Sequence, residues 1–126
     1  MPYPIRITIA NQSFAAELNE TVMARKIHEA LPIEARSNRW GDEIYFSIGV
    51  KHEGGDPMRD EMQVGELAYW PPGKAFCIFW GPTPASEADE PRAASGAVPV
   101  GHILGNCASL SKTRDGQMVV IESRND

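Results

Sequence analysis

Residues 66–83, ELAYWPPGKAFCIFWGPT, constrain the fold of this chain more than any other segment. The alternation of side chains predicts two strands joined at a double proline, and both faces of these strands are apolar. One face carries Leu67, Tyr69, Phe76, Ile78 and Trp80, and the other carries Ala68, Trp70, Cys77 and Phe79. A strand that is apolar on both faces has to be covered on both, or lie in a barrel wall with something packed outside it. Pro72-Gly73 fits a type II turn in which glycine takes a positive φ, and a trans Trp70-Pro71 bond is expected.

Length and composition predict one β-rich domain over residues 1–126. A chain of 126 residues builds one hydrophobic core, and 11 glycines plus 10 prolines favour many turns. The net charge of −5 argues against nucleic acid and anionic membrane surfaces as partners. No apolar run reaches the roughly 20 residues that span a bilayer. The N-terminal residues do not resemble a signal peptide, so a cytoplasmic location is expected.

Further strands are predicted by period-two alternation, and two short helices by helical spacing. The strands are expected over 5–9, 13–18, 33–40, 43–50, 98–104 and 117–123, with Ile5, Ile7 and Ile9 pointing inward. A helix over 20–31 has Asn19 as its N-cap and ends at Pro32, and a second covers 106–112. Residues 82–99, rich in proline, alanine and acid, are interpreted as a surface excursion that is mobile in part. Seven or eight strands with two short helices predict a closed β-barrel.

Three segments together resemble a known family. They are WGDEIYF at 40–46, GELAYWPPGKAFCIFWGPTP at 65–84 and VPVGHI at 98–103. Their order and spacing are similar to those of the small bacterial and archaeal cyclophilin-like domain proteins, and the YWPPGKA block is the most specific part. The resemblance covers nearly the whole chain and implies a cyclophilin-like β-barrel, but no defined activity.

The cyclophilin peptidyl-prolyl isomerases are more distant relatives. Their Phe-His-Arg and Gln-Gly-Gly-Asp signature is missing here, which predicts that this chain lacks isomerase activity. The nearest candidate for the missing arginine is Arg39, a guanidinium that could stabilise a twisted amide. No catalytic residue is assigned.

Ligand binding is the first functional hypothesis. A cleft at the side of the barrel would hold a small molecule or an extended peptide, since aromatic side chains are common in concave binding sites. The candidate ligand-binding residues are Arg39, Tyr45, Trp70, Phe76 and His102.

Two alternatives stay open beside ligand binding. One is a prolyl isomerase with a non-standard site at Arg39, and the other is an interaction protein that forms a homodimer, so the chain is expected to be a monomer or a weak homodimer. No metal or cofactor is expected, because His28, His52 and His102 lack paired spacing and the two cysteines match no metal-binding pattern. Cys77 is interpreted as a buried free thiol.

Overall fold

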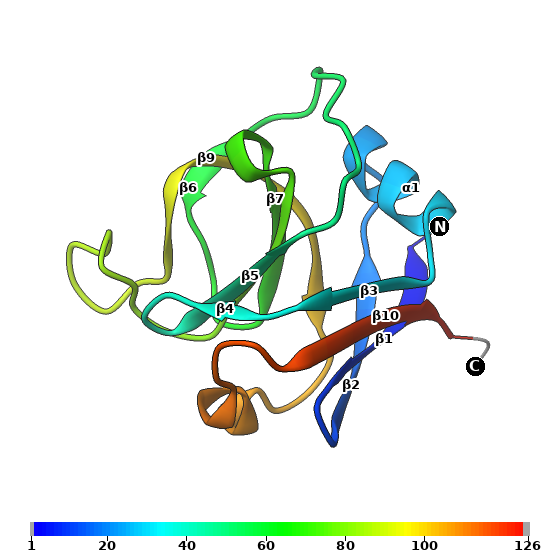
Figure 1. The fold of residues 1–126 in the computed structure, drawn as a ribbon. Coiled ribbons are helices and arrows are strands. Elements are labelled where there is room, and N and C mark those ends of the chain that lie inside the picture. The colour runs from blue at the N-terminus through cyan, green and yellow to red at the C-terminus, as the bar shows by residue number, and fades with distance from the viewer. Residues whose placement is uncertain (1, 125–126) are drawn as a thin grey trace.

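The structure, a computed structural model, describes residues 2–124 (Figure 1). Residue 1 and residues 125–126 of the predicted domain lie outside the described residues. The strands are β1 (Tyr3–Ile9), β2 (Gln12–Leu18), β3 (Ile33–Arg36), β4 (Asn38–Arg39), β5 (Glu43–Ser47), β6 (Arg59–Glu61), β7 (Glu66–Trp70), β8 (Ala75–Phe79), β9 (Arg92–Ile103) and β10 (Met118–Ser123). The helical elements are α1 (Val22–Glu29) and two 3-10 helices, η1 (Pro71–Gly73) and η2 (Ala108–Lys112). Within the described part, no helix has the length and apolar character needed to cross a bilayer.

The ten strands form an antiparallel sheet that wraps around one core without closing. The order is β3-β10-β1-β2-β9-β7-β8-β5-β4, and β6 pairs with β9 beside this path. Its two end strands, β3 and β4, follow each other in the chain with only Ser37 between them. No ladder joins the two ends within residues 2–124, so the predicted closed barrel is wrong, as is the count of seven or eight strands.

Ser37 is the point at which the predicted strand 33–40 breaks in two. Its N–H donates to the carbonyl of Gln117 at 2.9 Å, and its hydroxyl donates to the carbonyl of Arg114 at 2.5 Å. Before Ser37 the chain pairs with β10, and after it the chain pairs with β5. A change of partner strand does not alter the hydrophobic periodicity, so the sequence pattern does not reveal the break at Ser37. Strands of two or three residues, such as β4 and β6, are too short to show a periodic pattern.

The inner core contains the residues that the alternation places inward in β1. Ile5, Ile7 and Ile9 are fully buried, as predicted. Figure 1 shows α1 and η2 at opposite ends of the wrapped sheet, and both contribute buried side chains to the same core, including Ile27 and Leu110.

Helix α1 is shorter than the predicted helix over 20–31. Its N-cap is Thr21, whose hydroxyl accepts from Ala24 N–H at 3.1 Å, so the assignment of Asn19 as the cap is wrong. Asn19 instead accepts from Thr21. The carboxylate of Asp56, distant in sequence, accepts from Met23 N–H at 2.9 Å, which satisfies another amide at the start of the helix.

The β7–β8 hairpin has the predicted two apolar faces but a different turn. Leu67, Tyr69, Phe76 and Ile78 belong to the inner core, while Ala68, Cys77 and Phe79 belong to a second, outer cluster. The turn is the 3-10 helix η1, closed by Lys74 N–H donating to Pro71 C=O at 3.1 Å. Lys74, with φ of 47°, takes the left-handed conformation and Gly73 does not, so the type II turn is wrong. Among the described residues the cis peptide bond is Leu31-Pro32, so Trp70-Pro71 is trans as expected.

Strand β9 occupies residues 92–99, eight of the 18 residues in the segment 82–99 that is predicted to be a surface excursion. It begins at Arg92, and its first part pairs with β6 and contributes Ala93 and Ala97 to the outer cluster. The loop before it is held by hydrogen bonds: Thr83 N–H donates to Ser86 Oγ at 2.8 Å, and Glu87 N–H donates to Glu90 Oε2 at 2.7 Å. The excursion prediction is therefore wrong for residues 92–99, because small residues such as alanine and glycine can lie in a strand that packs closely against a sheet.

Candidate functional site

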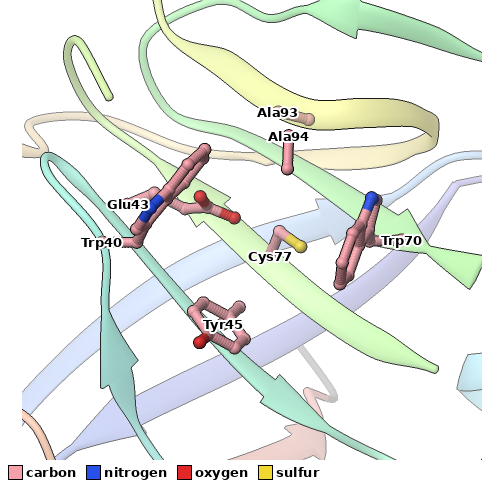
Figure 2. Close-up of a pocket in the computed structure, with 7 residues that line it drawn as sticks. All are labelled: Trp40, Glu43, Tyr45, Trp70, Cys77, Ala93 and Ala94. Carbon is pink, nitrogen blue, oxygen red and sulfur yellow. The ribbon is translucent and has the colours of Figure 1, made fainter. Parts of the chain in front are cut away.

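A cavity of about 240 Å³ lies on the outer face of the sheet. It is open to solvent on one side and bordered by the turn between β4 and β5 and by parts of β5, β7, β8 and β9 (Figure 2). Its lining residues are Trp40, Glu43, Tyr45, Trp70, Cys77, Ala93 and Ala94. Figure 2 shows the rings of Trp40 and Trp70 on opposite sides, with Tyr45 on a third side and Glu43 and Cys77 between them.

Trp40 is positioned by a tight turn. Its N–H donates to Glu43 C=O at 2.9 Å, and Gly41 takes a φ of 64°. A Cβ at Gly41 would lie 2.8 Å from the Cα of Thr83, so only glycine fits both the conformation and the space. Asp42 N–H donates to the carbonyl of Pro82 at 2.9 Å, which fastens the turn to the segment after β8. The turn therefore holds Trp40 and Glu43 at the cavity.

Trp70 is positioned by two contacts. Its indole Nε1–H donates to the Ser95 hydroxyl at 2.8 Å. Its ring lies against Gly73, where a Cβ would be 3.1 Å from two ring carbons. Tyr45 is set by strand register, because it lies directly opposite Cys77 in the β5–β8 ladder. Trp70 is thus held by the hairpin turn and β9, and Tyr45 by the pairing of β5 with β8.

Glu43 carries the one carboxylate that lines the cavity. It is only 4% exposed, and its side chain makes no ion pair within the described residues. Burial raises the pKa of Glu43 from its ordinary value of 4.5 to about 7, and a hydrogen bond from the Cys77 thiol lowers it in part. Near neutral pH the group therefore exists in both protonation states, and can act as a hydrogen-bond donor or as a negative charge.

Cys77 forms the floor of the cavity beside Glu43 and is a buried free thiol, as predicted. It is 2% exposed, and burial, followed by the Glu43 charge, raises the pKa of the thiol well above its usual value. The thiolate is the nucleophilic form of cysteine, so this environment suppresses nucleophilic chemistry at Cys77. Within residues 2–124, no three His, Cys, Asp or Glu side chains are grouped so as to hold a metal ion.

Two of the five predicted ligand-binding residues, Tyr45 and Trp70, line this cavity. Phe76 is fully buried on the inner face, where it stacks on Phe46 with ring centroids 5.6 Å apart. His102 is exposed on β9, at positions paired with β2 and β7, and borders two other surface hollows of about 330 and 380 Å³.

Arg39 is engaged elsewhere by its hydrogen bonds. Its Nη1 donates to the carbonyls of Ser111 at 2.7 Å and Thr113 at 2.9 Å, and its Nη2 pairs with Asp42 at 3.1 Å. The guanidinium also lies over the ring of Trp80, 5.2 Å from the centroid. These contacts join the end of β4 to η2, and Arg39 is not among the residues that line the cavity.

The sequence interpretation missed the part of the cavity formed by Trp40, Glu43, Ala93 and Ala94. No sequence signal marked Glu43, because it shares with Tyr45 the face of the predicted strand 43–50 that lies opposite the apolar one, where a charged residue is ordinary. Its burial, like the role of the two alanines, depends on β9 crossing the outer face.

Comparisons with known proteins agree with this architecture. The family model described as Cyclophilin-like matches residues 3–122. The solution structure of the hypothetical protein AF2241 from Archaeoglobus fulgidus is similar, with 37% sequence identity and a TM-score of 0.82, over 98% of this chain and 95% of that chain. A search of curated proteins gave no match. The extent of the family match and the identity over nearly the full chain show that this protein belongs to the cyclophilin-like family.

Proposed function

We propose that this protein is a binding module whose outer-face cavity holds one small molecule. The observation that carries the proposal is the cavity itself, in which three aromatic rings surround a single buried carboxylate. Apolar walls with few polar groups are typical of small-molecule sites, because the walls supply binding energy and the polar groups fix orientation. The Ser95 and Gly73 contacts hold Trp70 in place before any ligand arrives, which reduces the ordering cost of binding.

The volume supports a small ligand over an extended peptide. A cavity of about 150 Å³ holds benzene, and this one, at about 240 Å³, is larger by less than a factor of two. It suits one small molecule better than several residues of an extended chain.

The two alternatives gain no specific support from the site. For the isomerase hypothesis, Arg39 would have to leave three backbone carbonyls and Asp42 to reach a substrate. A proline-peptide isomerisation assay tests this hypothesis. The protein should accelerate isomerisation only if another group takes the catalytic role proposed for Arg39. For the homodimer hypothesis, the exposed large apolar residues come from separate elements: Val22, Met58, Val64, Leu104 and Met118. Light scattering at two concentrations tests it.

A cavity-blocking variant tests the proposed function. Ala94 lines the cavity and is exposed, so Ala94→Phe should fill the space without disturbing the buried core. Ala15→Phe is the matched control, because Ala15 is an exposed strand alanine in β2 that does not line the cavity. Ligand-detected NMR of a library of one- and two-ring molecules and small amines should give compounds that bind the wild type and Ala15→Phe but not Ala94→Phe. A library without any compound that depends on position 94 would refute the proposal.

A further inference from the structure

The charge balance of the cavity favours a positively charged ligand. Glu43 is buried among apolar side chains and lacks a cationic partner within the described residues. A buried carboxylate is stable only if it is protonated or paired with a positive charge. Figure 2 shows the carboxylate directed towards the middle of the cavity, where a ligand could supply that charge.

We propose that the cavity binds a small organic monocation, a methylated or quaternary ammonium group, with Glu43 as its counter-ion and Trp40, Tyr45 and Trp70 as its aromatic walls. This inference rests on the proposed function and names the ligand class for the same site. The ligand is a free small molecule, in keeping with the size of the cavity.

Aromatic walls and a single carboxylate favour this chemical class over others. A cation over the face of an aromatic ring is attracted by the ring quadrupole, and tryptophan gives the strongest attraction. Methyl groups on nitrogen fill apolar space and weaken the hydration of the charge. Such a cation therefore loses little hydration free energy when it moves from water into the cavity. A hard metal ion prefers several oxygen ligands, whereas this cavity presents one carboxylate and one phenol hydroxyl. An anionic ligand would be repelled by Glu43.

Binding of a cation should be linked to loss of the Glu43 proton. Cys77 of β8 and Tyr45 of β5 are the other titratable groups that line the cavity, and the lining residues from the β4–β5 turn, β7 and β9 carry none. Of the neighbouring charges, Asp42 is paired with Arg39. On the side of β9, Arg92 is paired with Glu90, Asp60 and Glu61. The carboxylate of Glu43 is therefore the group whose ionisation a bound cation would favour.

The pH dependence of binding separates a cationic from a neutral ligand. A cation binds the ionised carboxylate, so its affinity should rise with pH up to about pH 7 and then level off. A neutral molecule that accepts a hydrogen bond from the protonated carboxyl should show the reverse. The two ligand classes are thus distinguished by the sign of the effect.

The experiment compares choline with 3,3-dimethylbutan-1-ol, an uncharged molecule of the same shape, by isothermal titration calorimetry at pH 5.5 and 8.5. Only about 3% of a carboxyl with a pKa near 7 is ionised at pH 5.5, so choline should bind about thirtyfold more tightly at pH 8.5. The alcohol should bind more weakly than choline at pH 8.5 and gain nothing from the higher pH.

Variants connect the effect to named residues. Glu43→Gln should weaken choline binding at pH 8.5 by about tenfold or more and remove the pH dependence, because the amide keeps the shape but not the charge. Trp40→Leu should cost about tenfold in affinity, with Trp40→Phe as a milder variant if the leucine variant folds poorly. Trp80→Leu is the matched control: Trp80 does not line the cavity, so choline affinity should be unchanged.

The outcomes separate this inference from the proposed function. If the alcohol binds as tightly as choline at both pH values, the cavity is a ligand site but the cation inference is overturned. If neither probe binds while the NMR library gives compounds blocked by Ala94→Phe, the cation inference again fails alone. If the library also gives none, both fail. A trimethyl-lysine peptide that binds tenfold more tightly than choline would assign the site to a protein side chain and overturn the small-molecule ligand.

Discussion

The Glu43 carboxyl and the Cys77 thiol both line the floor of the cavity, and each group alters the ionisation of the other. The thiol lowers the pKa of Glu43 in part, while the negative charge of Glu43 adds to the effect of burial in raising the pKa of Cys77. This pairing requires the β5–β8 register, in which Tyr45 is opposite Cys77 and Glu43 is opposite Phe79. The two groups lie on diagonal positions of neighbouring strands, within side-chain reach of each other.

Cys77 should be nearly inert to thiol reagents in the folded protein. It is buried and its pKa is raised, whereas Cys107 is partly exposed. In the variant Cys107→Ser, reaction with a chromogenic disulfide reagent should be slow until denaturant is added, and in Cys77→Ser one thiol should react in the native state. Reaction of native Cys77 at the rate of Cys107 would contradict the buried position of this thiol.

Glu43 should lower the stability of the protein as pH rises. The pKa of Glu43 is about 7 in the folded state and about 4.5 in the unfolded state, so the folded state holds the proton more tightly between these values. The stability that the Glu43 proton contributes to the folded state is fully present below about pH 4.5 and is lost as pH rises through 7. The free energy of unfolding falls by about 3 kcal/mol over this range.

Glu43→Gln isolates this effect from all other titrating groups. The free energy of unfolding of the variant, relative to that of the wild type, should be about 3 kcal/mol higher at pH 8.5 than at pH 4. Urea unfolding of both proteins at both pH values measures this change. Equal differences between the two proteins at both pH values would show that Glu43 is not perturbed by burial.

Gly101→Ala should be strongly destabilising. A Cβ at this position would lie 2.1 Å from the carbonyl oxygen of Glu17 and 2.9 Å from the Cα of Leu18, so β2 and β9 would have to separate. The cost should be about 3 kcal/mol or more. Gly96→Ala is the matched control in the same strand, because its Cβ would meet only Met58 at an ordinary 3.6 Å. In thermal unfolding, the free energy of unfolding of Gly96→Ala should lie within about 0.5 kcal/mol of the wild-type value. A similar loss of stability in both variants would count against the close packing at Gly101.

Arg39→Ala should destabilise the fold without weakening ligand binding. The guanidinium donates to the carbonyls of Gly41, Ser111 and Thr113, and its loss should cost about 2 kcal/mol. Arg36→Ala is the comparison, since Arg36 makes one exposed bond to the carbonyl of Gly116 and should cost less. Chemical unfolding measures both variants. A loss of choline binding in folded Arg39→Ala would contradict this prediction and show that the Arg39 bonds to Gly41 and Asp42 help to hold the turn that carries Trp40 and Glu43.

The sequence alone determined which residues face the core. Alternation in residues 5–9 and in the hairpin of β7 and β8 assigned each side chain to its face, because a strand places successive residues on opposite sides. The candidate ligand-binding residues chosen from the sequence include Tyr45 and Trp70, which line the cavity, but also Phe76, which lies in the inner core. Short-range periodicity was sufficient to assign these faces, because the face on which a side chain lies depends only on its position along its own strand.

Only the tertiary structure decided how these strands enclose a site. The change of partner at Ser37, the crossing of the outer face by β9 and the turn that holds Trp40 all depend on hydrogen bonds between distant segments. The burial of Glu43, and with it the raised pKa, exists only once β9 covers β5 and β8. Solvent exclusion is a property of the assembled layers, so a carboxylate that looks ordinary in the sequence becomes the defining polar group of the cavity.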